Sequence, residues 1–364
     1  MAPLASVVVT NHNHAPYLGQ ALDSALAQSY ADVEVVAVDD GSTDWSADVL
    51  AGYRGDVVAV QQANAGTDAA LSAGFAASRG EVVLFLDSDD VLEAAALERA
   101  VDALSDPAVV KVHWPLREID AGGGATGRLW PGARLSQGDL REALLAGGPL
   151  NFPWSPTSGN AFRREFLSRI LPIPKTGGTL ADVYLCGLAP VYGRTARLDE
   201  PLGRYRVHAA NLSRRGTFEA RLARGLWRSE VTFESVRAHF RAQGFEVDPE
   251  GWKAGSWWHR IAAAVQDIAS TIPEGATFIL ANDDQWGNGD EIAGRRRLHW
   301  GPPADDASAV DELERLRALG AGHAAFVWPA LWWLEHYRGL NEHLRSRHRC
   351  LLANDRAALF ELRS

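Results

Sequence analysis

The chain has 364 residues, of which 46% are hydrophobic and 23% are charged, as is typical of globular proteins and not of disordered ones. Its formal net charge of -10 argues against a nucleic-acid partner, because binding to nucleic acid calls for a dominant basic surface. No signal-peptide pattern opens the sequence and no apolar run approaches the roughly 20 residues that span a bilayer, so we predict a cytoplasmic protein and leave peripheral membrane contact and homo-oligomer formation open.

Strand and helix signals alternate along the first hundred residues. Short apolar runs predict strands at 6–10, 33–40, 56–62 and 81–87. Apolar residues at helical spacing predict helices at 15–28, 66–78 and 93–104, and a capping stretch at 42–44 predicts another that ends near residue 50. Strands separated by one helix each imply right-handed crossovers. The predicted fold class is therefore α/β, with a mostly parallel, Rossmann-like sheet flanked by helices.

The alternation loosens after about residue 110. The pattern predicts a turn that runs into a helix over 154–170, a helix at 179–193, two strands within 195–208 and a helical, arginine-rich stretch at 217–243. Eight of the thirteen tryptophans lie at or after Trp252, where helices are predicted at 252–272, 308–319 and 330–346, strands at 277–281, 296–300 and 324–328, and a hairpin at 349–362. We therefore predict a main domain at 1–215, a helical connector at 216–250 and a small α/β domain of unknown role at 251–364.

Polar residues follow each of the first four predicted strands. In chain order they are Thr10, Asn11 and Asn13, then Asp39 and Asp40, then Asn64, and finally Asp87, Asp89 and Asp90. Ligands of open α/β sheets bind beyond the carboxyl ends of the strands, where these side chains are expected to meet. Capping or turn formation explains any one of them but explains all four groups poorly.

Three carboxylates within four positions indicate a cation site. Residues i and i+2 of an extended chain project to the same side, so Asp87 and Asp89 are expected to face one pocket. Clustered carboxylates become tolerable when a cation neutralises them, and oxygen ligands favour hard ions such as Mg²⁺ or Mn²⁺. Magnesium commonly combines one or two carboxylates with the phosphates of a substrate.

The signals of several other site types are missing. The sequence has no GxxxxGK[ST] loop and no GxGxxG after the first strand, which disfavours P-loop and dinucleotide sites. Cys186 and Cys350 lack CxxC spacing, so we expect reduced core cysteines and no thiolate metal site.

Two segments of the sequence resemble a known family. "SVVVTNHNHAPYLGQALDSALAQSYADVEVVAVDDGSTD" and "NAGTDAALSAGFAASRGEVVLFLDSDDVL" look like the nucleotide-sugar domain of family 2 glycosyltransferases, which have the GT-A fold. The resemblance is dense over residues 5–110 and sparser to about residue 215. It implies inverting transfer of a sugar from a nucleoside diphosphate donor, expected to be a UDP-sugar, to a glycan or glycoconjugate acceptor, with Mn²⁺ or Mg²⁺.

The resemblance also implies roles for individual residues. Thr10 and Asp40 match the positions that hold the nucleobase, with Asp39 beside them. Asp87 and Asp89 form the DxD motif, in which Asp89 matches the principal metal ligand. The residues implied for nucleotide binding are Thr10, Asn13, Asp39, Asp40, Asn64 and Asp87; those implied for the metal are Asp89, Asp90 and His208; Gly159 and Asn160 match the loop at the donor sugar and acceptor.

Asp182 is the residue implied as the general base. The family places an acidic pair at the start of a helix about 90 residues after DxD, where an inverting transferase needs a group that deprotonates the acceptor. Ala181 occupies the place of the first acidic residue and departs from the pattern. The alternative role for Asp182 is an acid that stabilises the helix dipole.

Further departures leave other functions open. Leu71 and Ser72 stand where the family commonly has Arg and Asn, and Arg206 or His208 could compensate for the lost charge. A degenerate module that binds nucleotide or glycan without transfer therefore stays an alternative, as does a sugar nucleotidyltransferase, although the glycine-rich loop of that class is missing. His12 and His14 lie two positions apart, a spacing that could suggest a metal site, but we expect a loop role for both.

Overall fold

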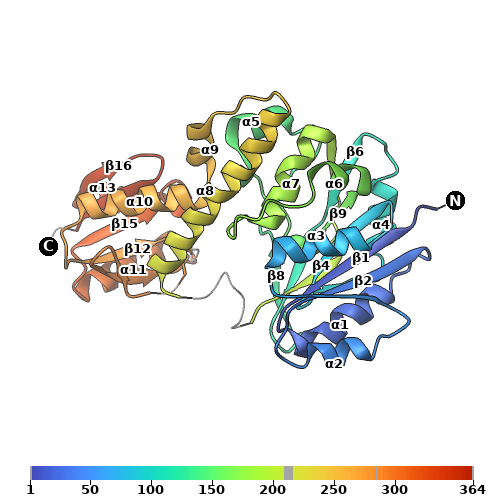
Figure 1. The fold of residues 1–364 in the computed structure, drawn as a ribbon. Coiled ribbons are helices and arrows are strands. Elements are labelled where there is room, and N and C mark those ends of the chain that lie inside the picture. Colours follow the sequence, from blue (N-terminus) through green and yellow to red (C-terminus); the bar gives the residue numbers. More distant parts are fainter. Residues whose placement is uncertain (1, 209–215, 284–285, 288, 363–364) are drawn as a thin grey trace. The chain divides into compact units, whose positions relative to one another are not determined.

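The computed structural model describes residues 2–208, 216–283, 286–287 and 289–362. The chain divides into two compact units, Met1–Asn211 with Arg228–Trp252, and Leu212–Trp227 with Lys253–Ser364. The long helix α8 (Phe218–Ala242) gives its first ten residues to the second unit and the rest to the first (Figure 1).

A seven-stranded sheet forms the centre of the first unit. Its strand order is β10-β6-β9-β4-β1-β2-β3. The strands are β1 (Ala5–Asn11), β2 (Val33–Asp40), β3 (Val58–Gln62), β4 (Val82–Asp87), β6 (Val109–His113), β9 (Asn160–Arg163) and β10 (Arg194–Arg197). All neighbours are parallel except β9, which runs antiparallel to both β4 and β6. The predicted α/β class with a mostly parallel sheet is confirmed.

Helices cover both faces of this sheet because its central strands are apolar on both sides. Residues of alternating parity in β1 and β4 enter two different cores. One core holds α3 (Thr67–Ala77), α6 (Arg164–Ile170), α7 (Ala181–Tyr192) and the later part of α8; the other holds α1 (Ala15–Leu26), α2 (Ser46–Ala51) and α4 (Ala96–Ala103). Figure 1 shows α3 and α1 on opposite sides of β1 and β2.

A smaller four-stranded sheet borders the candidate site. Its order is β5-β11-β7-β8, formed by β5 (Val91–Leu92), β11 (Gly203–Arg206), β7 (Leu116–Ile119) and β8 (Ala125–Trp130). Helix α5 (Arg141–Gly147) and the 3-10 turns at Pro149–Asn151 and Thr157–Gly159 complete this unit. Strand β5 begins right after the carboxylate cluster and pairs with β11, which leads to His208.

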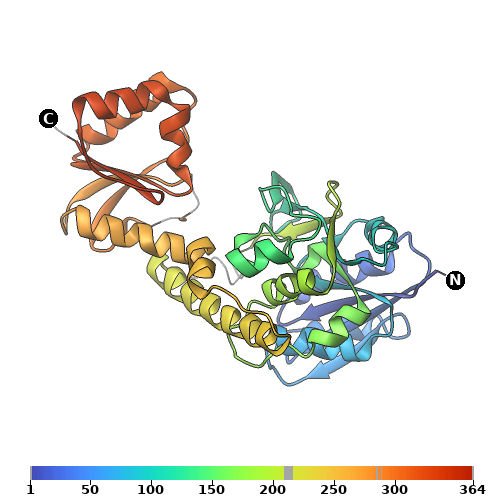
Figure 2. The same cartoon turned by 90° about the horizontal axis from the view of Figure 1, so that it is seen from above.

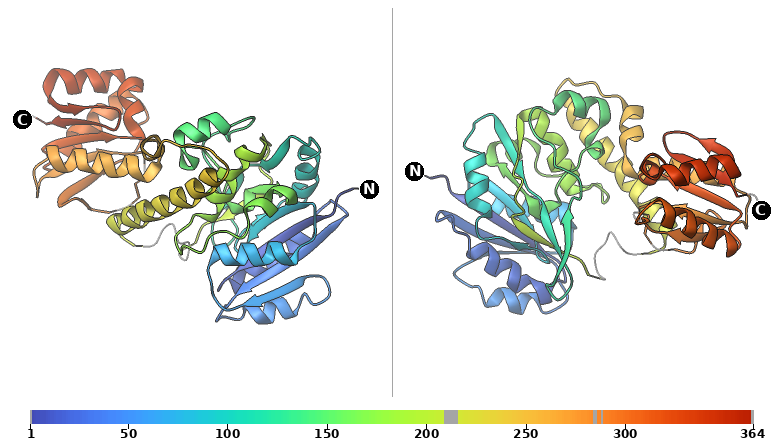
Figure 3. Two further views of the ribbon diagram at one scale, coloured as in Figure 1. Left: turned by 45° about the horizontal axis from the view of Figure 1, so that its top comes forward. Right: turned by 180° about the vertical axis from the view of Figure 1, so that it is seen from behind.

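The second unit is a separate α/β layer structure. Its six-stranded sheet has the order β13-β14-β12-β15-β17-β16. The strands are β12 (Thr277–Ala281), β13 (Glu291–Ile292), β14 (Arg295–Trp300), β15 (His323–Val327), β16 (Arg349–Ala353) and β17 (Ala357–Glu361). Helices α11 (Asp306–Ala318), α12 (Trp333–His336) and α13 (Arg338–Arg347) pack on one face, and α10 (Trp257–Thr271) packs on the other (Figure 2 and Figure 3).

Several expected elements differ in the structure. The predicted helix at 252–272 is interrupted at Ser256, which separates α9 (Pro249–Gly255) from α10, and the one at 330–346 is divided into three short pieces. Both cysteines are free as expected, but Cys350 is exposed and only Cys186 is a core residue. Among the described residues no helix is long and apolar enough to cross a membrane.

Candidate functional site

Parallel register brings the polar strand ends of the first unit to one edge of the sheet. Thr10 at the end of β1 pairs with Asp87 of β4, and Asn11 pairs with Asp39 of β2. The Thr10 side chain also hydrogen-bonds the Asp87 carboxyl. The expected meeting of strand ends is therefore present in the structure.

The two acidic residues that end β2 each organise a neighbouring loop. The Asp39 Oδ1 atom accepts hydrogen bonds from Asn11 Nδ2 at 3.0 Å and from Ser42 Oγ at 2.5 Å. The Asp40 carboxylate accepts backbone N–H bonds from Ala65 and Gly66, each at 2.9 Å. These bonds hold the loops after β2 and β3 beside the end of β1.

Asn13 and Asn64 lie in the same loop cluster. Asn13 adopts a left-handed backbone with φ of 59°, and its Oδ1 accepts the Thr43 N–H at 2.7 Å. The exposed Asn64 places its Nδ2 3.0 Å from Nε2 of His12. His12 thus has the loop role that its position predicts.

Asp90 is the most deeply buried of the three carboxylates that follow β4. Asp90 is 1% exposed, and its carboxylate accepts hydrogen bonds from Ser158 Oγ at 2.7 Å and from the Arg206 N–H at 2.8 Å. Burial raises the pKa of the Asp90 carboxyl well above its usual range, and the charges of Asp89 and Asp87 raise it further. Both oxygens of Asp90 are thus engaged in fixing the turn.

Asp89 belongs to a group of potential metal ligands. Its Oδ2 atom lies 2.9 Å from His208 Nε2, and ligand atoms of His14, Asp89 and His208 all lie within 4.8 Å of one another. Two imidazole nitrogens and one carboxylate oxygen form a donor set that suits Mn²⁺ and similar ions. The structure thus brings the predicted Asp89 and His208 together, adds His14, and leaves Asp90 outside this group.

Asp87 lies between this cluster and the opposite side of the site. It is half-buried, and burial raises the pKa of its carboxyl to about 7, with Asp89 and Asp182 as further causes. Burial raises the pKa of the Tyr205 phenol on β11. The charges of four carboxylates raise it further: those of Asp87, Asp89, Asp90 and Asp182. The sequence pattern carries no signal for Tyr205.

Asp182 lies in the first turn of α7, on the side of the site occupied by α3. Burial raises the pKa of the Asp182 carboxyl, against the effects of the Val183 N–H bond and the positive charge of Arg228. Asp68 of α3 also interacts with Arg228, and burial raises the pKa of Asp68 to about 6 although the charge of Arg228 opposes the shift. Sequence reasoning misses Arg228 and Asp68, because no motif marks either residue.

Helix α8 holds the segment that leads into α7. Arg228 donates to the carbonyl oxygens of Gly178 and Thr179, both at 3.3 Å. Thr232 Oγ1 accepts the Leu180 N–H at 2.9 Å. These bonds fix the backbone just before Asp182.

Leu71 and Ser72, which depart from the family pattern, both take part in the packing of the first unit. Leu71 is fully buried in the core, and Ser72 Oγ accepts the Ile173 N–H at 3.2 Å. The Arg206 Nε donates to the Asp89 carbonyl at 2.8 Å and the residue is 1% exposed, so its positive charge lies buried beside the DxD segment. Arg228 is another positive charge in this part of the structure, and it lowers the pKa of Asp182.

The turn at residues 155–160 supports the DxD segment. Ser158 Oγ accepts the Asp87 N–H at 3.1 Å, and Asn160 Nδ2 donates to the Ser155 and Pro156 carbonyls at 3.1 and 2.7 Å. The turn leaves no room for a side chain at Gly159, because a Cβ atom there would overlap Ser155 Oγ and lie 2.8 Å from the Trp114 carbonyl oxygen. Gly159 and Asn160 therefore shape this turn.

Gly159→Ala is expected to destabilise the first unit by about 1–3 kcal/mol, because the Trp114 backbone cannot move away from the added methyl. Chemical denaturation followed by circular dichroism measures the loss. Gly132→Ala is the matched control, since a Cβ atom at Gly132 meets no other atom within 4 Å and should change stability little. Equal stability of the two variants would contradict the prediction.

A buried lysine lies behind this turn. Lys111 is fully buried, with its Nζ 2.8 Å from His113 Nδ1 and 4.6 Å from the centre of the Trp154 ring. Its ammonium also hydrogen-bonds Cys186, whose Sγ donates to Asn160 Oδ1 at 3.4 Å. Burial lowers the pKa of Lys111 to about 8, and the interaction with Cys186 opposes the shift.

The lowered pKa of Lys111 predicts how the free energy of unfolding changes with pH. Between pH 8 and pH 10.5 the folded chain has lost the Lys111 proton while the unfolded chain retains it, so the free energy of unfolding should rise through this window. The rise in the free energy of unfolding should be about 3 kcal/mol, because each pKa unit is worth 1.36 kcal/mol. Lys111→Met has no ammonium group at this position and should not show this rise. Urea titrations of both proteins across this window measure the difference. The exposed Lys175 gives the control, since Lys175→Met should keep the wild-type slope.

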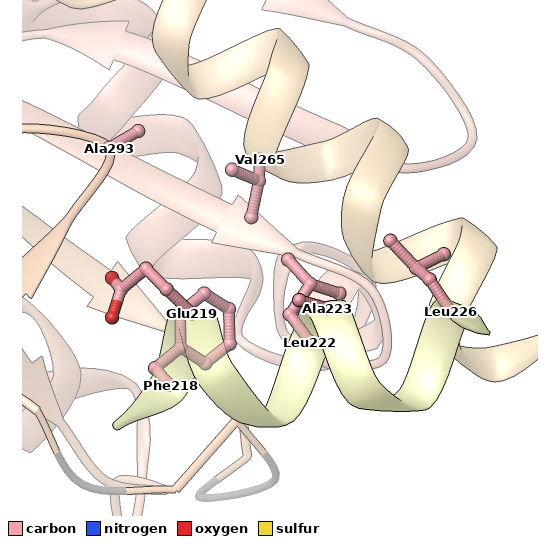
Figure 4. Close-up of a pocket in the computed structure, with 7 residues that line it drawn as sticks. All are labelled: Phe218, Glu219, Leu222, Ala223, Leu226, Val265 and Ala293. Carbon is pink, nitrogen blue, oxygen red and sulfur yellow. The ribbon is translucent and has the colours of Figure 1, made fainter. Parts of the chain in front are cut away.

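An apolar hollow in the second unit does not have the chemistry of this site. Phe218, Leu222, Ala223, Leu226, Val265 and Ala293 line it, with Glu219 at its rim (Figure 4). A nucleoside diphosphate needs polar partners, which the lining of this hollow offers only at Glu219. The candidate site is therefore the carboxylate edge of the first unit.

Comparison with protein families agrees with this placement. The sequence profile described as "Glycosyl transferase family 2" matches residues 6–171, which carry β1 through α6 and the DxD segment. Residues 6–171 of the chain therefore resemble a family 2 glycosyltransferase domain. The match supports the predicted family for this segment of the chain and supports the prediction of a transferase.

Relatives of the family 2 domain carry glycosyltransferase names. An uncharacterised glycosyltransferase of Nostoc sp. is 40% identical over 213 residues, which cover 57% of this chain and 65% of that protein. The hyaluronan synthase of Pasteurella multocida is 33% identical over 150 residues, which cover 40% of this chain and 15% of the synthase. The chain thus spans less than two thirds of the length of either relative.

A solved structure shares the fold. The mannosyltransferase PcManGT from Pyrobaculum calidifontis, in complex with GDP-Man and Mn²⁺, superposes with a TM-score of 0.50 at 21% identity, covering 75% of this chain and 77% of that one. At this identity the likeness establishes the GT-A architecture alone.

Proposed function

We propose that this chain is a metal-dependent, inverting glycosyltransferase that moves a sugar from a nucleoside diphosphate donor to a glycan or glycoconjugate acceptor. The observation that carries the proposal is the convergence at the carboxyl edge of the sheet, where Asp87 lies within electrostatic reach of both Asp89 and Asp182. We expect a UDP-sugar as donor and the cytoplasm as the place of action.

The nucleotide would lie at the ends of β1, β2 and β3. Asp39 and Asp40 already hold the loops at 41–44 and 64–66 by hydrogen bonds, which keeps the pocket in shape before the donor arrives. The mannosyltransferase from Pyrobaculum calidifontis binds GDP-Man, so a GDP-sugar is the second donor to test. The residues proposed to surround the nucleotide are Thr10, Asn13, Asp39, Asp40, Asn64 and Asp87.

The metal would be held by Asp89, His208 and His14, whose ligand atoms lie within 4.8 Å of one another. This donor set fits Mn²⁺ or Mg²⁺, with Mn²⁺ favoured by the two imidazoles. When bound, such an ion neutralises the diphosphate and stabilises its negative charge as it departs. For Asp90 we propose that it fixes the turn through Ser158 and the Arg206 N–H, in place of the ligand role expected from the sequence.

Asp182 would act as the general base. In a single displacement the acceptor hydroxyl attacks the anomeric carbon, the bond from that carbon to the diphosphate breaks, and Asp182 takes the hydroxyl proton. Burial raises the pKa of Asp182, which makes the carboxylate a stronger base than one in water. Arg228 opposes this shift and favours the ionised carboxylate that proton transfer requires.

Transfer can be tested by incubating the full chain and Mn²⁺ with UDP-, GDP- and dTDP-sugars and a panel of glycan acceptors. Release of a nucleoside diphosphate together with a glycosylated product would support the proposal, and proton NMR of the new anomeric centre would report inversion. Nucleotide binding without turnover of any donor would favour the degenerate binding module. Formation of a nucleotide sugar from a sugar phosphate and a nucleoside triphosphate would favour the nucleotidyltransferase.

A further inference from the structure

A second group of metal-ligating side chains belongs to the second unit and shares no residue with the proposed transfer site. Glu314 lies on α11, His343 lies on α13, and His348 follows the last residue of α13. The ligand atoms of these three residues all lie within 4.8 Å of one another. No short sequence motif joins them, because Glu314 lies 29 positions before His343.

The two imidazoles converge on one carboxylate oxygen. His343 Nε2 lies 2.8 Å from Glu314 Oε1, and His348 Nε2 lies 4.0 Å from the same atom. A tetrahedral zinc ion with bonds near 2.0 Å would separate its ligand atoms by about 3.3 Å. The observed distances lie on both sides of that value, so small side-chain rotations would complete the geometry.

The surroundings hold the three side chains in place. Arg317 Nε donates to the other carboxylate oxygen, Glu314 Oε2, at 2.7 Å, so that Oε1 is the oxygen that faces the imidazoles. The side chains of His343 and His348 are 14% and 3% exposed. Leu313 and Leu344 are fully buried in the common core of α11 and α13, which fixes the two backbones.

We propose that Glu314, His343 and His348 bind one divalent cation of the zinc class, with a fourth position open to water. Two neutral imidazoles and one carboxylate suit zinc, whereas Mg²⁺ and Ca²⁺ prefer oxygen ligands. The bound ion would join α11, α13 and the start of β16, and so stabilise the second unit. The positive charges of Arg317 and Arg347 near the cluster weaken cation binding, so the site should be weaker than one without them.

Zinc binding is tested on the full chain with Asp89→Asn and His208→Gln in place, which removes the other cluster. Equilibrium dialysis against Zn²⁺ should give one ion per chain, and Co²⁺ should give the visible absorption of a four-coordinate site. Zn²⁺ should also raise the melting temperature above its value in a chelator, whereas Mg²⁺ should not. No stoichiometric zinc binding in this background would overturn the proposal and leave a hydrogen bond between His343 and Glu314.

Variants on α11 and α13 separate ligation from general charge effects. Glu314→Gln and His343→Gln should weaken zinc binding by about tenfold or more. Glu312→Gln is the control, because Glu312 also pairs with an arginine three residues later, Arg315 at 2.6 Å, but is not a member of the histidine cluster. Zinc binding that survives Glu314→Gln and His343→Gln, or that falls equally in Glu312→Gln, would overturn the assignment. Circular dichroism in chelator confirms that each variant is folded.

Discussion

Asp182→Asn is expected to lower the rate of sugar transfer by about 10²- to 10⁴-fold, the usual contribution of a general base. The amide cannot take the proton from the hydroxyl group of the sugar acceptor. It preserves the size of the side chain and the hydrogen bond from the Val183 N–H, which is 2.9 Å long in the wild type. Donor binding should therefore change little. Steady-state kinetics with saturating donor, together with calorimetric binding of the nucleotide, separates the two effects.

The neighbouring carboxylate gives a matched control for Asp182. Asp68 is half-buried, also interacts with Arg228, and has its pKa raised to about 6 by burial, but has no proposed part in proton transfer. Asp68→Asn should reduce the rate by less than about tenfold. A larger loss in Asp68→Asn than in Asp182→Asn would show that the base had been assigned to the wrong residue.

Asp89→Asn is expected to lower turnover by about 10²- to 10³-fold, because a bound metal supplies several kcal/mol of charge stabilisation. The substitution removes the carboxylate oxygen that lies 2.9 Å from His208 Nε2. The Mn²⁺ concentration for half-maximal activity should rise at least about tenfold. Activity assays across a Mn²⁺ titration measure both quantities.

Comparing Asp90→Asn with Asp89→Asn separates a structural role from a metal-binding role in two adjacent residues. Ser158 Oγ and the Arg206 N–H donate to different oxygens of Asp90, so Asp90→Asn keeps an acceptor for only one of the two bonds and should lower the melting temperature of the first unit. Its Mn²⁺ midpoint should stay near the wild-type value. A shifted Mn²⁺ midpoint in Asp90→Asn but not in Asp89→Asn would reverse the two roles.

The convergence of the strand ends could be predicted because it follows from a short-range pattern. Apolar runs such as 82–86 mark buried parallel strands, and each is followed by polar residues at a position that parallel register carries to one edge. Thr10 and Asp87 are direct register partners, as that rule requires. The class of the fold and the place of the site therefore both follow from periodicity.

The antiparallel strand β9 could not be predicted in the same way. Its four residues, Asn160–Arg163, are followed at once by α6, and their strand conformation depends on pairing with β4 and β6. Such a strand is too short to show a periodicity of its own, and its conformation is determined by tertiary contacts. The 154–170 segment therefore carries the pattern of a turn and a helix only.

The side chains that complete the site escape sequence reasoning for a related reason. His14 lies in a loop 75 positions before Asp89 in the sequence, and Arg228 comes from a long helix whose arginines otherwise look like surface charges. Their relation to Asp89 and Asp182 emerges only when β1, β4, α7 and α8 are packed together. Spacing along the chain carries no information on such contacts.

Metal-assisted binding of a nucleoside diphosphate is tested most directly by calorimetric titration of UDP, GDP and dTDP into the wild-type chain with and without Mn²⁺. We predict that one of the three, expected to be UDP, binds in a Mn²⁺-dependent manner and that Asp89→Asn loses this dependence. Failure of all three nucleotides to bind in the presence of Mn²⁺ would contradict the proposed transferase.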